Sequence, residues 1–159
     1  MSDRAVHLIF VVEGYTEEAL FNRVLLPHLA GHDLQVQGAT IVGKTKAKKR
    51  DQPQRGGGKY SDWVQDLRRI TANPNPAFRF TTLFDLYGLP DDFPERGRQV
   101  SDRSNADRCD RLEQVLADQI DDWRFIPYLQ LHEFEALVLA CLPHLEALSV
   151  ADALVSTPG

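Results

Sequence analysis

The chain has 159 residues, of which 43% are hydrophobic and 26% are charged, and its formal net charge is −5. These proportions are ordinary for a globular protein and exclude disordered, collagen-like and coiled-coil chains. No apolar run approaches the roughly 20 residues that cross a bilayer, and the first residues do not resemble a signal peptide. We therefore expect one domain over residues 1–159, located in the cytoplasm and without a membrane partner.

Short apolar segments alternate with amphipathic segments along the chain. Hydrophobic periodicity predicts strands over residues 5–12, 34–42, 78–85 and 125–131, and helices over residues 16–30, 61–70, 104–120 and 133–141. We expect Thr16 to cap the first helix and Pro27 to kink or end it. Pro127 predicts an edge position or a bulge in the last strand. The alternation predicts an α/β fold with a mostly parallel sheet of about four strands flanked by helices.

Positive charge is concentrated in residues 43–59. This segment holds seven of the 18 basic residues and one acidic residue, whereas the rest of the chain has 11 basic and 22 acidic residues. Three consecutive glycines, at 56–58, are typical of a flexible loop. Basic side chains bind phosphates without reading a base sequence, so the segment is either a contact for DNA or RNA or a solvated loop. The residues assigned to this contact are Lys44, Lys46, Lys48, Lys49, Arg50 and Lys59.

Acidic residues stand at the ends of three predicted strands. Glu13 follows the first strand, Asp85 ends the third, and Glu133 and Glu135 follow the fourth. In parallel α/β sheets, ligands bind beyond the carboxyl ends of the strands. Converging carboxylates repel one another unless a cation joins them, and their oxygens suit Mg²⁺ or Mn²⁺. Such an ion activates water and holds phosphodiester oxygens. A structural role is the alternative for Glu13, Glu133 and Glu135, because acidic side chains also stabilise the start of a helix.

Other parts of the sequence have both a functional and a structural interpretation. The string GATIVGKT (residues 38–45) matches a phosphate-binding loop, but its middle is strand-like and a basic loop follows it, so ATP binding is not expected. His132, beside Glu133, is a candidate for proton transfer or an ordinary structural histidine. Cys109 and Cys141 do not have the spacing of zinc ligands, and both are expected in the core. Two isolated cysteines are typical of a protein in a reducing compartment.

Three strings carry a resemblance to a known group of proteins. VVEGYTEEALF (residues 11–21) resembles the first motif of the TOPRIM domain in OLD-family nucleases, where a strand delivers a glutamate ahead of Gly-x-(Ser/Thr)-Glu. TLFDLYGLPDDFP (82–94) and IPYLQLHEFEALVLA (126–140) resemble a family of small bacterial TOPRIM-like proteins of unknown function, the domain of unknown function 4276. The resemblance spans roughly residues 6–140 and implies a TOPRIM-like, Rossmann-like fold. It also implies that related chains continue into another helical segment.

The same resemblance implies roles for the acidic residues. Glu13 would be the acid/base and metal-side glutamate, Asp85 the first aspartate of an Asp-x-Asp motif, and Glu133 or Glu135 the late acid. Tyr87 stands where the second aspartate is expected and cannot replace a metal-binding carboxylate. Asp91 or Asp92 in the next loop is a possible substitute.

The sequence thus supports three hypotheses. The first is a Mg²⁺- or Mn²⁺-dependent nuclease with catalytic residues Glu13, Asp85 and Glu133 and with Glu135 as a further metal ligand. The resemblance implies service in bacterial defence or DNA repair beside an ATPase partner, and a homodimer is possible. The second is a non-catalytic nucleic-acid-binding or regulatory subunit with a degraded metal site. The third is a phosphatase or nucleotidyl-transfer enzyme for small substrates.

Overall fold

The computed structural model describes residues 6–30, 35–42, 58–97, 102, 104–131 and 136. Its strands are β1 (His7–Val12), β2 (Gln35–Ile41), β3 (Phe78–Asp85), β4 (Phe125–Ile126) and β5 (Leu129–Gln130). Its helices are α1 (Tyr15–Leu20), the π-helical turn η1 (Phe21–Leu25), α2 (Leu26–Ala30), α3 (Tyr60–Thr71) and α4 (Asn105–Ile120). Each predicted element in these ranges is present; the bounds of β3 match the prediction, and the other elements have shifted ends. The helix predicted over residues 133–141 lies outside the described residues, apart from Ala136.

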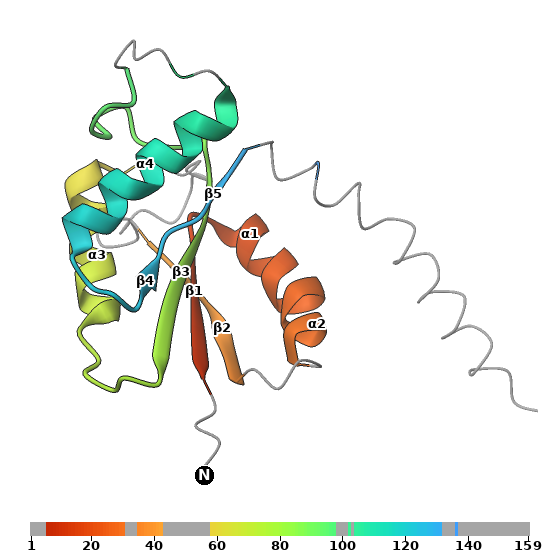
Figure 1. The fold of residues 1–159 in the computed structure, drawn as a ribbon. Helices are drawn as coiled ribbons and strands as arrows, with labels where there is room; N and C mark the ends of the chain where they lie inside the picture. The colour runs from red at the N-terminus through yellow and green to blue at the C-terminus, as the bar shows by residue number, and fades with distance from the viewer. Residues whose placement is uncertain are drawn as a thin grey trace, which may run out of the picture.

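The five strands form a mostly parallel sheet in the order β2-β1-β3-β4, with β5 also pairing with β3. All four strand pairings are parallel. The helical connection from β1 leads to β2 on one side, whereas α4 connects β3 to β4 on the other side (Figure 1). The strand order therefore reverses between β1 and β3. This doubly wound arrangement is Rossmann-like, and the reversal is its topological switch point.

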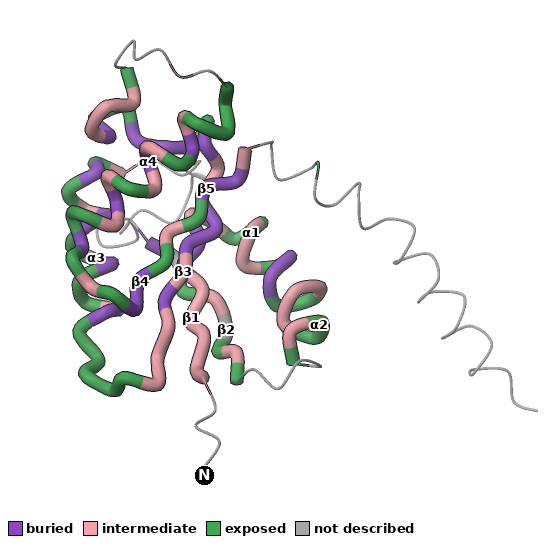
Figure 2. The backbone as a smooth tube through the Cα atoms, viewed as in Figure 1, coloured by how far each residue is buried: buried purple, intermediate pink, exposed green. Residues whose placement is uncertain are grey.

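Helices cover both faces of the sheet because successive strand residues point to opposite sides. On one face, the Phe10 ring packs on Phe21 of η1 with ring centroids 4.4 Å apart. On the other face, Val11 belongs to the main core together with Phe84, whose ring centroid lies 4.6 Å from that of Trp63 in α3. Most of the buried residues gather between the sheet and α3 and α4 (Figure 2).

Helices α3 and α4 supply most of that core through apolar residues at helical spacing. The residues buried on these two helices include Trp63, Val64, Leu67, Cys109, Leu112, Leu116 and Ile120, and the core position expected for Cys109 is confirmed. Cys109 is a free thiol. Ser104 begins α4 because its hydroxyl accepts a hydrogen bond of 3.1 Å from the Asp107 main-chain N–H.

The first helix differs from its prediction in two respects. Its N-cap is Gly14 and not Thr16, and no side chain caps it. The helix also continues past Pro27 to Ala30. A proline ring clashes with the carbonyl four residues earlier, which is that of Arg23. The wide π-helical turn over Phe21–Leu25 lies just before the proline and accommodates this disturbance, so the helix does not end there.

The last predicted strand is broken into β4 and β5 at Pro127 and Tyr128, as the proline indicated. Across the break, the Thr82 hydroxyl donates to the Tyr128 carbonyl and accepts from the Tyr128 N–H, both at 2.8 Å. The Glu113 carboxyl accepts from the Leu129 N–H at 2.7 Å. Side chains thus satisfy the main-chain groups that the interrupted ladder leaves open. None of the helices in the described ranges is long and apolar enough to cross a membrane.

Candidate acidic site at the strand switch point

Glu13 and Asp85 meet at the carboxyl ends of the two central strands. Glu13 directly follows β1, and Asp85 is the last residue of β3; the two strands pair in parallel, with Val12 opposite Leu83. Because the strand order reverses between β1 and β3, loops diverge here and leave space for a ligand. The predicted convergence of these two acids is therefore present in the structure.

A short hydrogen bond holds the Glu13 side chain in this position. Its Oε1 accepts from the Asp85 main-chain N–H at 2.7 Å. The Asp85 Oδ1 in turn accepts from the Tyr87 main-chain N–H at 3.0 Å, and the Asp85 carbonyl accepts from the Gly88 N–H at 3.1 Å. These bonds form a tight turn after β3. One oxygen of each carboxyl is thereby engaged with the main chain.

Two glycines lie directly against the acidic side chains. A β-carbon added to Gly88 would lie 2.7 Å from Glu13 Oε2, and one added to Gly14 would lie 2.9 Å from Glu17 Oε2. Both distances are too short for real atoms, so any other residue would displace a carboxyl group. Gly14 after β1 therefore leaves room for the Glu17 carboxyl group beside the main chain. Gly88 after β3 does the same for the Glu13 carboxyl group.

Glu13 is an unusual carboxyl group because its pKa is raised to about 8. Burial is the largest cause, and the negative charges of Glu17 and Asp85 add to it, while the hydrogen bond from the Asp85 N–H opposes it. In the protein without a bound metal ion, Glu13 therefore keeps its proton at neutral pH. A buried acid with a pKa near neutrality is a common feature of functional sites.

The turn following Asp85 is fixed by buried apolar residues, Leu86, Leu89 and Phe93. The next two acids in the chain have partners of their own. Asp92 accepts from the Tyr60 main-chain N–H at 2.9 Å and so begins α3, and Asp91 pairs with Arg96 at 2.9 Å in solvent. Each carboxyl is thus engaged by another partner, so these contacts do not support either residue as a substitute for the second aspartate. Tyr87, at that position, is 53% exposed.

The remaining predicted site residues are mostly outside the described residues. Glu133, Glu135 and His132 are among these, as are Lys44, Lys46, Lys48, Lys49 and Arg50. Lys59 is described, and it is exposed at the start of α3. Within the part of the chain that the structure describes, no group of three or more Asp, Glu, His or Cys side chains is arranged to hold a metal ion. The string GATIVGKT begins inside β2, which agrees with its rejection as a phosphate-binding loop.

Sequence reasoning missed Glu17 and Gly88 as parts of this site. Glu17 is the glutamate of the Gly-x-(Ser/Thr)-Glu string, and the sequence assigns it no role in the site. Its spacing of four from Glu13 was a usable signal, because the chain turns into α1 between them and returns Glu17 toward the strand end. Gly88 had a weaker signal, its position three residues after the strand-end aspartate.

Replacing Gly88 with alanine is expected to push the Glu13 carboxyl out of its position while the protein still folds, because the clash involves the end of a flexible side chain. Once displaced toward water, Glu13 should lose the burial that raises its pKa, so its titration midpoint should fall by roughly one unit or more. Carboxyl carbon NMR measures this midpoint. Gly97→Ala is the matched control, since its added β-carbon would meet nothing within 4 Å. A midpoint in Gly88→Ala equal to that of the wild type would contradict the proposed contact.

Strand order and site together define an α/β protein of Rossmann-like fold with an acidic pair at its switch point. The chain belongs to the family described as a domain of unknown function, DUF4276, whose sequence model matches residues 12–157. Comparison with curated proteins and with solved structures finds no match. The family membership expected from the sequence is therefore confirmed.

Proposed function

We propose that the acidic site is the centre of a metal-dependent, TOPRIM-like nuclease that cleaves nucleic-acid phosphodiesters. The observation that carries the proposal is the Glu13 carboxyl, partly buried at the switch point and hydrogen-bonded to the Asp85 N–H at 2.7 Å. A partly buried acid beside two further acids is costly for folding, and function is a common reason for such a cost. The resemblance of residues 11–21 to the first TOPRIM motif supports the same interpretation.

The donor set is compatible with magnesium or manganese. Mg²⁺ binds proteins through one or two carboxylates and completes its coordination with water and substrate phosphates. Glu13 and Asp85 each engage one oxygen with the main chain, and the other oxygen of each could bind the ion. A bound ion would polarise the phosphodiester and lower the pKa of a water molecule. Glu133 and Glu135 remain further candidate ligands from the sequence.

The residues of the chain would handle binding and proton movement. A carboxyl with a pKa near 8 exchanges its proton readily close to neutral pH, which suits Glu13 Oε2 for proton transfer to or from a reacting oxygen. Lys59 is exposed at the start of α3, and the Tyr60–Asp92 hydrogen bond ties that helix end to the turn after Asp85. Together with the basic residues at 44–50, Lys59 would hold the backbone of DNA or RNA.

A cleavage assay tests this function. Purified protein is incubated with plasmid DNA, single-stranded DNA and RNA in Mg²⁺ or Mn²⁺, with and without a chelator. We expect metal-dependent cleavage that falls by roughly 100-fold or more in Glu13→Gln, the range typical of a lost acid/base group. Glu18→Gln removes a charge from the neighbouring helix α1 and should retain activity. Equal cleavage by Glu13→Gln and the wild type would refute the assignment.

A second function, a non-catalytic nucleic-acid-binding or regulatory subunit, is favoured by one observation. Tyr87 occupies the position of the second aspartate, and it is largely exposed. Such a subunit would bind nucleic acid equally well with and without metal. Its affinity would fall steeply with salt concentration, and less steeply after the basic residues at 44–50 and Lys59 are neutralised. Service beside an ATPase partner in defence or repair is compatible with either function.

A further inference from the structure

The guanidinium group of Arg96 lies against the turn that follows β3. Its Nη2 donates to the main-chain carbonyl of Tyr87 at 3.2 Å, and its Nη1 donates to that of Leu89. Nη1 also bonds Asp91 Oδ1 at 2.9 Å. The donors of a guanidinium group form a planar fork, so one side chain can hold two carbonyls at a fixed separation. Arg96 therefore joins the residues on both sides of Gly88.

Gly88 is the point where this turn meets the acidic site. A β-carbon added to it would lie 2.7 Å from Glu13 Oε2 and 3.4 Å from the Asp85 β-carbon, so its main chain lies directly beside both acids. The Tyr87 N–H bonds the Asp85 carboxyl at 3.0 Å, while Arg96 holds the carbonyl of the same tyrosine. Arg96 thus fixes the main chain that confines the two acids, although none of its bonds in the described structure is to either of them.

The main chain that carries Arg96 is itself held by α4. Glu95 has a φ of 62°, a left-handed conformation that is unfavourable for a residue with a β-carbon and that persists only where the surroundings hold it. Arg111 of α4 donates to the Glu95 carbonyl at 3.3 Å and pairs with the Glu95 carboxylate at 3.2 Å. Arg108 of α4 donates to the Arg96 carbonyl at 3.1 Å. Arg96 is therefore anchored on α4 and not on the turn that it supports.

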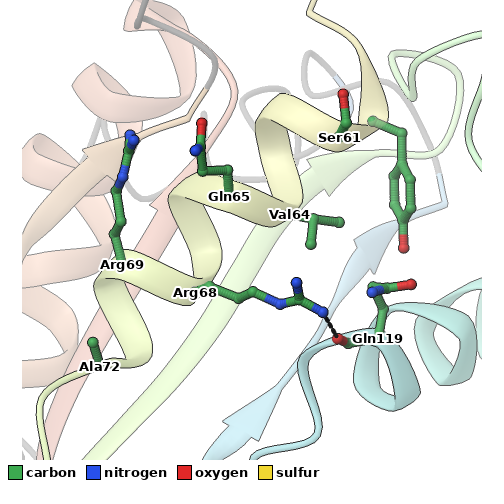
Figure 3. A pocket seen from close by; sticks show the side chains of 8 residues that line it. Ser61, Val64, Gln65, Arg68, Arg69, Ala72 and Gln119 are labelled. Atoms are coloured by element: carbon green, nitrogen blue, oxygen red, sulfur yellow. Dashed lines mark hydrogen bonds between the residues drawn. The ribbon is translucent and has the colours of Figure 1, made fainter.

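Helix α4 gives this anchor a fixed position. Its apolar face is buried in the core through Cys109, Leu112, Leu116 and Ile120. Near its last turn, the Gln119 main-chain carbonyl accepts a hydrogen bond of 3.1 Å from Arg68 of α3 (Figure 3). The packed core thus determines where Arg96 lies, and Arg96 determines where the turn lies.

We propose that Arg96 is the positioning residue of the acidic site: by fixing the turn at residues 87–89, it keeps the Glu13 and Asp85 carboxyl groups side by side. The consequence for metal binding rests on the proposed function. Without the fixed turn, the two carboxyl groups must be ordered when an ion binds, and this cost lowers the affinity. A simple charge effect has the opposite sign, because a nearby guanidinium group repels a metal ion.

Amide hydrogen exchange in the metal-free protein tests the positioning directly. The Asp85 N–H is the reporter, because it bonds Glu13 Oε1. Arg96→Gln should speed its exchange by roughly fivefold or more, the value of one hydrogen bond. The Phe80 N–H of the same strand, bonded to the Arg124 carbonyl at 2.9 Å, should exchange at the wild-type rate. A general loss of stability would speed both amides.

Calorimetric titration of Mn²⁺ measures the consequence for the site. Arg96→Gln should bind roughly fivefold or more weakly than the wild type, although it removes a positive charge. Arg96→Lys should recover only part of this loss, since an ammonium group lacks the fork. Arg79→Gln is the matched control and should behave like the wild type in both experiments. Its guanidinium also donates to two main-chain carbonyls, but at the opposite end of β3 from Asp85.

Two outcomes would overturn the proposal. One is Asp85 exchange that Arg96→Gln leaves unchanged or speeds only as much as that of Phe80. The other is Mn²⁺ affinity in Arg96→Gln that equals or exceeds that of the wild type. Absence of Mn²⁺ binding in the wild type would count against the proposed function, and the exchange rates would then still decide the role of Arg96.

Discussion

Replacing Glu13 with glutamine is expected to stabilise the metal-free protein at pH 9 and to leave its stability almost unchanged at pH 4. The folded protein holds the Glu13 proton with a pKa of about 8, whereas the ordinary value is 4.5. Between these values the folded state binds more protons than the unfolded state, so wild-type stability falls as pH rises through this window. Above pH 8 the loss is complete, because both states are then ionised.

The glutamine variant lacks this titration, so its stability should vary less with pH. We expect it to be more stable than the wild type by about 2–5 kcal/mol at pH 9, since each pKa unit corresponds to roughly 1.4 kcal/mol. Urea unfolding with a chelator present, at several pH values from 4 to 9, measures the difference. Glu18→Gln is the matched control and should follow the wild type. The quantity to compare is the stability difference between Glu13→Gln and the wild type. If this difference were the same at pH 9 as at pH 4, the pKa of Glu13 would not be raised in the folded protein.

Replacing Arg124 with methionine is expected to destabilise the fold by about 3–5 kcal/mol. Arg124 is 8% exposed and connects the start of β4 to the end of α3. Its guanidinium donates to the carbonyls of Thr71 at 2.9 Å and Asn75 at 3.0 Å, and to that of Asn73. It also pairs with Asp122 at 2.6 Å. Methionine fills a similar volume but leaves these acceptors without a donor.

Thermal and urea unfolding of Arg124→Met measure this loss. Arg69→Met is the control, because Arg69 is largely exposed and pairs only with Asp66 on its own helix in the described contacts, so its loss should cost less than about 1 kcal/mol. Arg124→Lys keeps the charge but cannot reach several carbonyls with one ammonium group, and it should recover only part of the stability. Equal stability of Arg124→Met and Arg69→Met would contradict the bridging role.

Most of the fold follows from periodicity, because buried strands and amphipathic helices have different spacing. The ends of β3 and α4 were predicted closely, since Asp85 ends an apolar alternation and Ser104 is a good N-cap. The acidic pair was predictable for a related reason. Parallel strands bring their carboxyl ends to one edge, so acids that follow neighbouring strands must lie close together.

Features that depend on tertiary contacts were not predictable in the same way. Thr16 has the chemistry of a cap, but the short approach of Glu17 to the main chain of Gly14 selects glycine there instead. Asp91 and Asp92 are aspartates, like the residue expected at position 87. Asp91 pairs with Arg96, and Asp92 accepts a hydrogen bond at the start of α3. Partners distant along the chain decide such positions, and no local pattern records them.

The most direct test of the acidic site is a calorimetric titration of Mn²⁺ into metal-free protein at pH 8.5. We predict saturable binding to the wild type that is weakened roughly tenfold or more in Glu13→Gln and in Asp85→Asn, as expected when a charged ligand is lost. Glu18→Gln should bind like the wild type. Absence of saturable Mn²⁺ binding, or affinity that is unchanged in both variants, would contradict a metal site at the switch point and favour the non-catalytic subunit.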